Sequence, residues 1–131
     1  MTPDPNGPRK VTVLGAGSWG TTFAKVLADA AADAGAQRTV CLWGRDPESM
    51  QRIAREHRND RYVPEIELPE TLEYSSDLRS ALAGADLVVA AIPAQSLRAQ
   101  LGAAASYVEP EAVILSLAKG LESGTGLRMT Q

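Results

Sequence analysis

The sequence predicts an α/β fold with a doubly wound parallel sheet, arranged in three layers. Short apolar segments alternate five times with helical patterns, and the segments at 86–92 and 112–117 lack the polar–apolar alternation of half-exposed strands. Unalternated apolar strands are typical of parallel sheets that are covered on both faces. Because crossovers between parallel strands are right-handed, winding in both directions from the first strand predicts the strand order 3-2-1-4-5.

Length and composition fit one soluble domain. The chain has 131 residues, of which 44% are hydrophobic and 22% charged, and its net charge is -3. This charge gives no reason to expect nucleic acid or an anionic membrane as a partner. No apolar run is long enough to cross a membrane, and Met1–Lys10 lacks the apolar core of a signal peptide. We therefore expect a cytoplasmic protein with a flexible tail at 1–8 and a single domain at 9–131.

A glycine-rich turn follows the first strand, which begins at Val11. Its glycines, Gly15, Gly17 and Gly20, have the Gly-x-Gly-x-x-Gly spacing of a Rossmann-type dinucleotide site. There the first glycine permits the tight turn, the second lets a pyrophosphate approach the backbone, and the third lets the helix pack closely. The following helix would offer its N-terminal N–H groups to phosphate. A tight turn without a ligand is the alternative.

The first helix is expected to end at Gly35. Its predicted buried face follows the spacing i, i+3, i+4, i+7, i+8. The residues at these positions are Phe23, Val26, Leu27, Ala30 and Ala31.

The second strand is predicted at 39–43, with Cys41 as a small buried residue that has no partner for an intramolecular disulfide. Asp46, Pro47 and Glu48 then read as N-cap, first helical residue and first-turn acid of a helix reaching about Arg58. The predicted apolar stripe of this helix comprises Met50, Ile53, Ala54 and His57.

The middle of the chain is less regular. Residues 59–69 contain two prolines and predict an ordered loop, and 72–74 predict a short third strand. Ser75 or Ser76 is expected to cap a brief helix that ends at Gly84. The later elements are a buried strand at 86–92, a helix opened by Pro93 and a last buried strand at 112–117. The apolar residues expected on the two helices are Leu78, Ala81 and Leu82, then Leu97, Leu101, Ala104 and Ala105.

Ligands of such sheets bind outside the carboxyl ends of the strands. The segments 15–20, 44–46, 92–95 and 118–120 should therefore converge on one cleft. Arg45 stands at the end of the second strand, where an acid would favour NAD, and a guanidinium suits a 2′-phosphate. NADP(H) is therefore the favoured cofactor, with NAD(H) also possible, unless Arg45 is only a solvated loop residue.

Three further residues have both a functional and a structural interpretation. Trp19 could lay its indole against the nicotinamide side of the cleft, or pack against the protein. Pro93 lies where the extended cofactor must pass, or simply starts a helix. Lys119 follows a buried strand and precedes Gly120, so its ammonium could attract a substrate phosphate or a developing alkoxide, unless it is an ordinary surface lysine.

Four motifs together resemble NAD(P)-dependent glycerol-3-phosphate dehydrogenase. They are Gly-Ala-Gly-Ser-Trp-Gly-Thr at 15–21, Leu-Trp-Gly-Arg-Asp-Pro at 42–47, Asn-x-x-Tyr-Val-Pro-x-x-x-Leu-Pro at 59–69 and Ala-Lys-Gly-Leu-Glu at 118–122. The resemblance implies reversible reduction of dihydroxyacetone phosphate to sn-glycerol 3-phosphate for phospholipid synthesis. It also implies cofactor contacts by Ser18, Trp19, Arg45 and Lys119, with Lys119 and Gly120 at the substrate.

Members of that family carry their general acid/base lysine in a helical second domain, which this sequence lacks. We therefore expect no catalytic residue in this chain and no turnover by it alone, with a homodimer possible in the full-length enzyme. His57, the only histidine, fits a packing role. The main alternative is a regulatory module that senses NAD(P) without catalysis. Among enzymes, ketopantoate reductase is a further candidate, but it shares the first motif and lacks Ala-Lys-Gly-Leu-Glu. The arginines at 52, 55, 58 and 61 alternate with acids and fit a solvated helix face.

Overall fold

The computed structural model describes residues 9–35, 38–61, 63–64, 66–92, 99 and 102–116. Within them lies a five-stranded parallel sheet of order β3-β2-β1-β4-β5, as the sequence predicts. The strands are β1 (Lys10–Leu14), β2 (Thr39–Trp43), β3 (Leu72–Ser75), β4 (Leu87–Ala90) and β5 (Val113–Ser116). The fold is the expected Rossmann-type α/β architecture.

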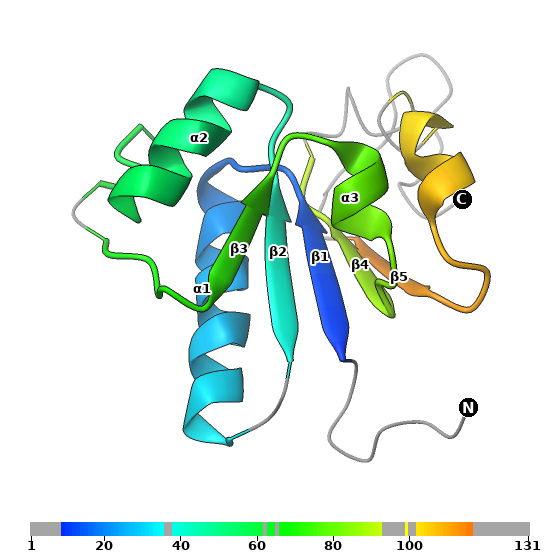
Figure 1. Cartoon of the computed structure of the whole chain (residues 1–131), viewed down its shortest axis with the longest axis horizontal. Coiled ribbons are helices and arrows are strands. Elements are labelled where there is room, and N and C mark those ends of the chain that lie inside the picture. Colours follow the sequence, from blue (N-terminus) through cyan, green and yellow to red (C-terminus); the bar gives the residue numbers. More distant parts are fainter. Residues whose placement is uncertain are drawn as a thin grey trace.

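Helices cover both faces of the sheet (Figure 1). One core cluster joins Val11 and Val13 of β1 to α1 (Ser18–Asp33) and α2 (Pro47–Glu56). The other joins Leu14 to α3 (Leu78–Leu82), next to the 3-10 turn η1 (Ala105–Tyr107). Successive strand residues point to opposite faces, so the central strands must be apolar throughout.

Two side chains of β1 hold the short helix α3 onto the sheet. The Thr12 hydroxyl is fully buried and donates to the Ala81 carbonyl. The Lys10 ammonium donates to the carbonyls of Ala83 at 2.7 Å and Ser80 at 3.2 Å. These bonds occupy carbonyl groups that a helix of five residues cannot pair internally.

Helix α2 begins as the sequence predicts. Asp46 is its N-cap, accepting from the Glu48 N–H at 3.2 Å, and Pro47 is the first helical residue. The Ser49 hydroxyl donates to the Asp46 carboxylate at 2.7 Å, and this bond is the main cause that lowers the pKa of Asp46. The helix ends at Glu56, before the predicted Arg58, because His57 adopts a left-handed conformation with φ 55°.

The predicted buried face of α1 is confirmed only in part. The buried residues of the helix are Gly20, Thr21, Ala24, Ala28 and Ala31. Of the predicted residues, Ala31 is buried, and Phe23 and Leu27 are partly buried and pack against the core. Val26 is 57% exposed and Ala30 is exposed, while Phe23 and Leu27 lie half-buried at the margins. The fully buried residues of α1 are thus all small, and the larger Phe23 and Leu27 reach the core cluster from partly buried positions.

The predicted cap of α3 is wrong. Its N-cap is Asp77, which accepts from the N–H groups of Arg79 and Ser80, rather than Ser75 or Ser76. Ser75 still belongs to β3, so it cannot take the cap position. The Ser80 hydroxyl donates to the Asp77 carboxylate at 2.7 Å, and this bond is the main cause that lowers the pKa of Asp77.

The last strand is not buried as predicted. In β5, Val113, Ile114 and Leu115 are 64%, 51% and 42% exposed, whereas Val88, Val89 and Ala90 of β4 are fully buried. Within the part of the chain that the structure describes, strand β5 lies at the end of the sheet order and pairs with β4 alone. An apolar run indicates burial only where other elements cover the strand.

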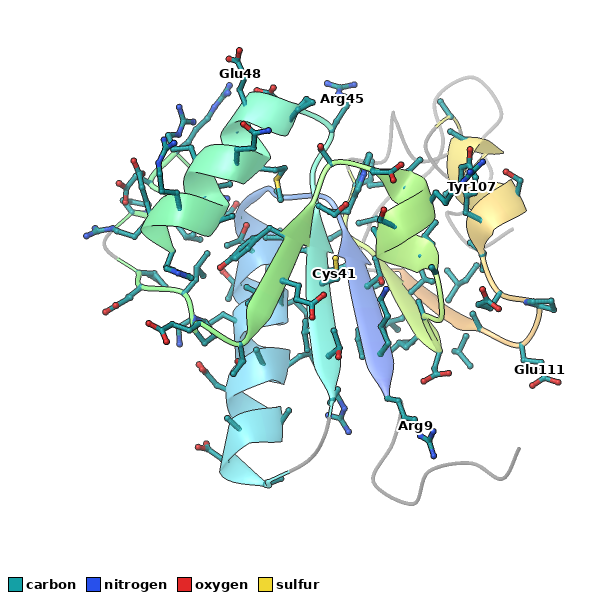
Figure 2. All side chains as sticks on the ribbon, viewed as in Figure 1. Arg9, Cys41, Arg45, Glu48, Tyr107 and Glu111 are labelled. Atoms are coloured by element: carbon teal, nitrogen blue, oxygen red, sulfur yellow. The ribbon has the colours of Figure 1, made fainter. Side chains whose placement is uncertain are left out.

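Cys41 is buried at the centre of β2, as predicted, and burial raises the pKa of its thiol to about 11 (Figure 2). The folded state holds this proton more tightly than the unfolded state. The contribution of the thiol to the free energy of unfolding is therefore fully present below the ordinary thiol pKa, and it is lost as the pH rises toward 11. We expect Ellman's reagent to label Cys41 at pH 8 only as fast as the chain unfolds. Rapid labelling of the native protein would contradict the burial.

Candidate functional site

The glycine-rich turn lies at the carboxyl end of β1, between two other strands. The Gly15 N–H donates to the Trp43 carbonyl at 2.9 Å, and the Leu14 carbonyl accepts from the Ala91 N–H at 2.9 Å. Gly15 has φ 114°, and a Cβ there would lie 2.5 Å from the Ala91 carbonyl oxygen. Both the conformation and the space therefore require glycine.

Gly20 brings the start of α1 against this turn. A Cβ on Gly20 would lie 1.8 Å from the Gly15 carbonyl oxygen, a backbone atom that cannot move aside. One residue later, the Thr21 N–H donates to the Gly17 carbonyl at 3.0 Å and closes the first helical turn. The close approach predicted for the third glycine is confirmed.

Gly17 differs from Gly15 and Gly20, the other two glycines of the motif, because it faces open space. It is the N-cap of α1, and a Cβ on it would meet no atom of the described residues within 4 Å. No side chain caps the helix there, and the first turn of α1 contains no acidic residue. The N–H groups and positive dipole end of a helix of 16 residues are thus left uncapped by the protein, which suits an anion.

Ser18 and Trp19 extend from this helix start. Both are exposed, and Trp19 is 71% exposed although it is among the largest apolar side chains of the chain. The structure therefore places the indole at the surface beside the glycine-rich turn, and it does not place it in the core. Exposed aromatic rings of this kind can stack on a planar ligand.

Arg45 lies at the carboxyl end of β2. Figure 2 shows its side chain extending outward beyond the strand ends, at the end of the sheet opposite to Arg9 and Glu111. The guanidinium is exposed and forms no ion pair with any part of the chain that the structure describes. The carboxylate of the neighbouring Asp46 is directed to the Glu48 N–H and the Ser49 hydroxyl as the cap of α2.

Two residues of this region, Gly44 and Asn59, have structural roles that their motifs alone did not reveal. Gly44 is buried, and a Cβ on it would lie 2.3 Å from Met50 Sδ and 3.1 Å from Ala16 Cβ, so the turns after β1 and β2 touch there. Asn59 is 5% exposed, and its Nδ2 donates to the Ala16 carbonyl at 2.9 Å and to Thr21 Oγ1 at 2.9 Å. The position of Asn59 at the head of the 59–69 motif was the available signal.

Other predicted residues fall outside this arrangement. His57 caps the end of α2, and its ring meets Tyr74 edge-on at 6.3 Å between centroids. This is a packing contact; Tyr74 itself has a pKa raised by burial to about 12. Ile92 is buried next to the end of β4, whereas Pro93, Lys119 and Gly120 lie outside the described residues.

Among the described residues, no helix is both long and apolar enough to cross a membrane. Within the same residues, no three His, Cys, Asp or Glu side chains are grouped so that they could hold a metal ion.

Comparison with known proteins gives a consistent result. The family described as "NAD-dependent glycerol-3-phosphate dehydrogenase N-terminus" matches residues 10–131. The chain is 50% identical over 127 residues to glycerol-3-phosphate dehydrogenase [NAD(P)+] of Nocardia farcinica, covering 93% of this chain and 36% of the relative. It is 49% identical over 122 residues to the Thermobifida fusca protein of the same name, covering 93% and 35%.

Solved structures agree with these relatives. Glycerol-3-phosphate dehydrogenase of Coxiella burnetii matches with a TM-score of 0.79 and 29% identity, over 88% of this chain and 34% of that one. Glycerol-3-phosphate dehydrogenase of Saccharomyces cerevisiae matches with a TM-score of 0.80 and 33% identity, over 88% of this chain and 35% of that one. The chain thus spans about a third of the length of the relatives and structures that it matches.

Proposed function

Because the chain belongs to the family of the N-terminal part of NAD-dependent glycerol-3-phosphate dehydrogenase, we propose that it forms the cofactor half of such an enzyme. The reaction is the interconversion of dihydroxyacetone phosphate and sn-glycerol 3-phosphate with a nicotinamide cofactor. One observation carries this proposal: the start of α1 is uncapped, and Gly17 faces space that no described protein atom fills.

The residues present fit a dinucleotide. The backbone at Gly15, Gly17 and Gly20 and the start of α1 would hold the pyrophosphate, with Ser18 beside it. The exposed indole of Trp19 would lie along the nicotinamide end. When bound, the nicotinamide supplies the hydride that reduces the substrate carbonyl.

Residues beyond the described part complete the proposal through the family resemblance. Pro93 would flank the extended cofactor, and Lys119 would contact both cofactor and substrate, with Gly120 beside it. An ammonium at that place attracts the substrate phosphate or the alkoxide charge that develops during hydride transfer. The general acid/base lysine is expected in a helical second domain, so residues 9–131 would form one NAD(P)-binding domain without turnover of its own.

The setting of the proposed enzyme follows from the same resemblance. We infer a cytoplasmic enzyme of glycerophospholipid synthesis that uses a small phosphate substrate. The alternative of a regulatory module that only senses NAD(P) gains no support from the relatives described above, which are named as dehydrogenases.

Cofactor choice is the finer part of the proposal, and NADP(H) is favoured over NAD(H). Arg45 is exposed at the end of β2, where a guanidinium can bind a 2′-phosphate through two hydrogen bonds. A charge-assisted bond contributes about 1.5–3 kcal/mol, so Arg45→Ala should weaken NADPH binding by roughly tenfold or more and leave NADH binding nearly unchanged.

Calorimetric titration of the parent chain and of Arg45→Ala with both cofactors measures this difference. Arg55→Ala serves as the control, because Arg55 is another exposed arginine, placed in the last turn of α2. Equal weakening of NADPH and NADH by Arg45→Ala would show that Arg45 does not read the 2′-phosphate. Failure of the parent chain to bind either cofactor would overturn the proposed function.

A further inference from the structure

The 59–69 loop, whose motif the cofactor site does not yet explain, is fixed to the end of α2. His57, in its left-handed conformation, turns the chain, and its carbonyl accepts from the Leu68 N–H at 2.7 Å. Arg58 and Glu67 form an antiparallel bridge, and the Asn59 carbonyl accepts from the Val63 N–H at 2.8 Å. Leu68 and Val63 are buried. The backbone that carries Asn59 is therefore held in one place.

The Asn59 side chain joins this loop to both ends of the glycine-rich turn. Its Nδ2 donates to the carbonyl of Ala16, between Gly15 and Gly17, and to the hydroxyl of Thr21 in the first turn of α1. The orientation of the amide is fixed, because the Ala16 carbonyl can only accept and therefore requires the nitrogen. Asn59 and Thr21 are both buried, so water does not replace these bonds readily.

This contact determines the direction of one backbone donor. In a trans peptide, the C=O and N–H groups point in opposite directions. Because the Ala16 carbonyl points inward to Asn59, the N–H of Gly17 in the same peptide points away from Asn59. Gly17 is the glycine that faces open space at the start of α1. The buried amide thus sets the outward direction of a donor that can face an anion.

We propose that Asn59 is a positioning residue for the cofactor pyrophosphate, holding the Ala16–Gly17 peptide with its N–H toward the ligand. The inference rests on the proposed function. It also gives the 59–69 loop a role: the loop supports the phosphate-binding turn from behind and has no need to contact the cofactor itself.

The test compares NADPH affinity, by fluorescence titration, with the midpoint of thermal unfolding. Asn59→Ala removes both bonds and should raise the Kd for NADPH by about tenfold. Thr21→Val keeps the side-chain volume and removes one acceptor, so it should raise the Kd by about threefold. Thr12→Val is the matched control, because it removes a buried threonine bond to the Ala81 carbonyl, on the α3 side of the sheet. It should lower the unfolding midpoint and leave the Kd unchanged.

The outcomes separate a positioning role from a structural one. An unchanged Kd in folded Asn59→Ala overturns the inference. If Asn59→Ala does not fold, Thr21→Val decides: a raised Kd supports the role of Asn59, and a Kd equal to that of Thr12→Val overturns it. Absence of NADPH and NADH binding by the parent chain overturns the proposed function itself, and with it the role given to Asn59.

Discussion

Gly17→Val is expected to abolish measurable NADPH binding while the chain stays folded. Gly17 has φ -80°, which valine adopts without strain, and a Cβ there meets no atom within 4 Å in the described part of the chain. The new side chain therefore costs the fold little, but it occupies the space in which pyrophosphate must reach the backbone. Loss of the phosphate contacts should weaken binding by about a hundredfold or more. Fluorescence titration with NADPH, alongside thermal unfolding, measures both effects.

Gly20→Ala is the matched control, because it should lower the stability of the fold, whereas Gly17→Val should lower cofactor binding. Its Cβ would lie 1.8 Å from the Gly15 carbonyl oxygen, so the helix and turn must separate. Overpacking of this kind costs about 1–3 kcal/mol or more, and the unfolding midpoint should fall clearly. If Gly17→Val binds NADPH as tightly as the parent chain, the glycine-rich turn is not the phosphate site.

Lys119→Ala is expected to depress kcat/KM for dihydroxyacetone phosphate by about a hundredfold or more, since its ammonium would stabilise charge that develops only in the transition state. The experiment needs a chain extended by the remaining part of a relative, because this chain spans only 36% of the Nocardia farcinica protein. Oxidation of NADPH, followed by absorbance at varied substrate concentration, gives the value.

Lys25→Ala is the control for the Lys119 experiment. Lys25 lies within α1, away from the carboxyl ends of the strands, and forms an ion pair with Asp29 at 2.5 Å. Its replacement should change kcat/KM little. The 131-residue chain should bind the cofactor without oxidising NADPH in the presence of dihydroxyacetone phosphate. Steady turnover by this short chain would contradict the division of the active site between two domains.

The sequence predicted the sheet because its signals are local. The strand order followed from the alternation of elements and the fixed hand of their crossovers, and the glycine spacing marked the turn at Gly15. The cap formed by Asp46 and Pro47 was also readable, since it depends on neighbours within three residues. The motifs at 15–21 and 42–47 predicted that Gly17 and Arg45 lie at the same end of the sheet, beyond the carboxyl ends of β1 and β2.

Burial could not be predicted in the same way, because it depends on distant parts of the chain. The apolar stripe through Val26 and Ala30 looked like a core face, but both residues are exposed, and the buried face of α1 carries small residues such as Ala24 and Ala28. The apolar run of β5 likewise looked buried, but its side chains are exposed, and within the described residues it pairs with β4 alone. Sequence periodicity carries no information about what covers a surface.

By itself, then, the sequence determined the element order, the glycine-rich turn and the family, because each is encoded in residues that are close together along the chain. Only the tertiary structure decided that Asn59 lies behind this turn, since its bond to Ala16 joins residues 43 positions apart. A hydrogen bond between such distant residues exists only after the sheet and both helices have packed. For this reason the orientation of the Gly17 donor is a property of the whole fold.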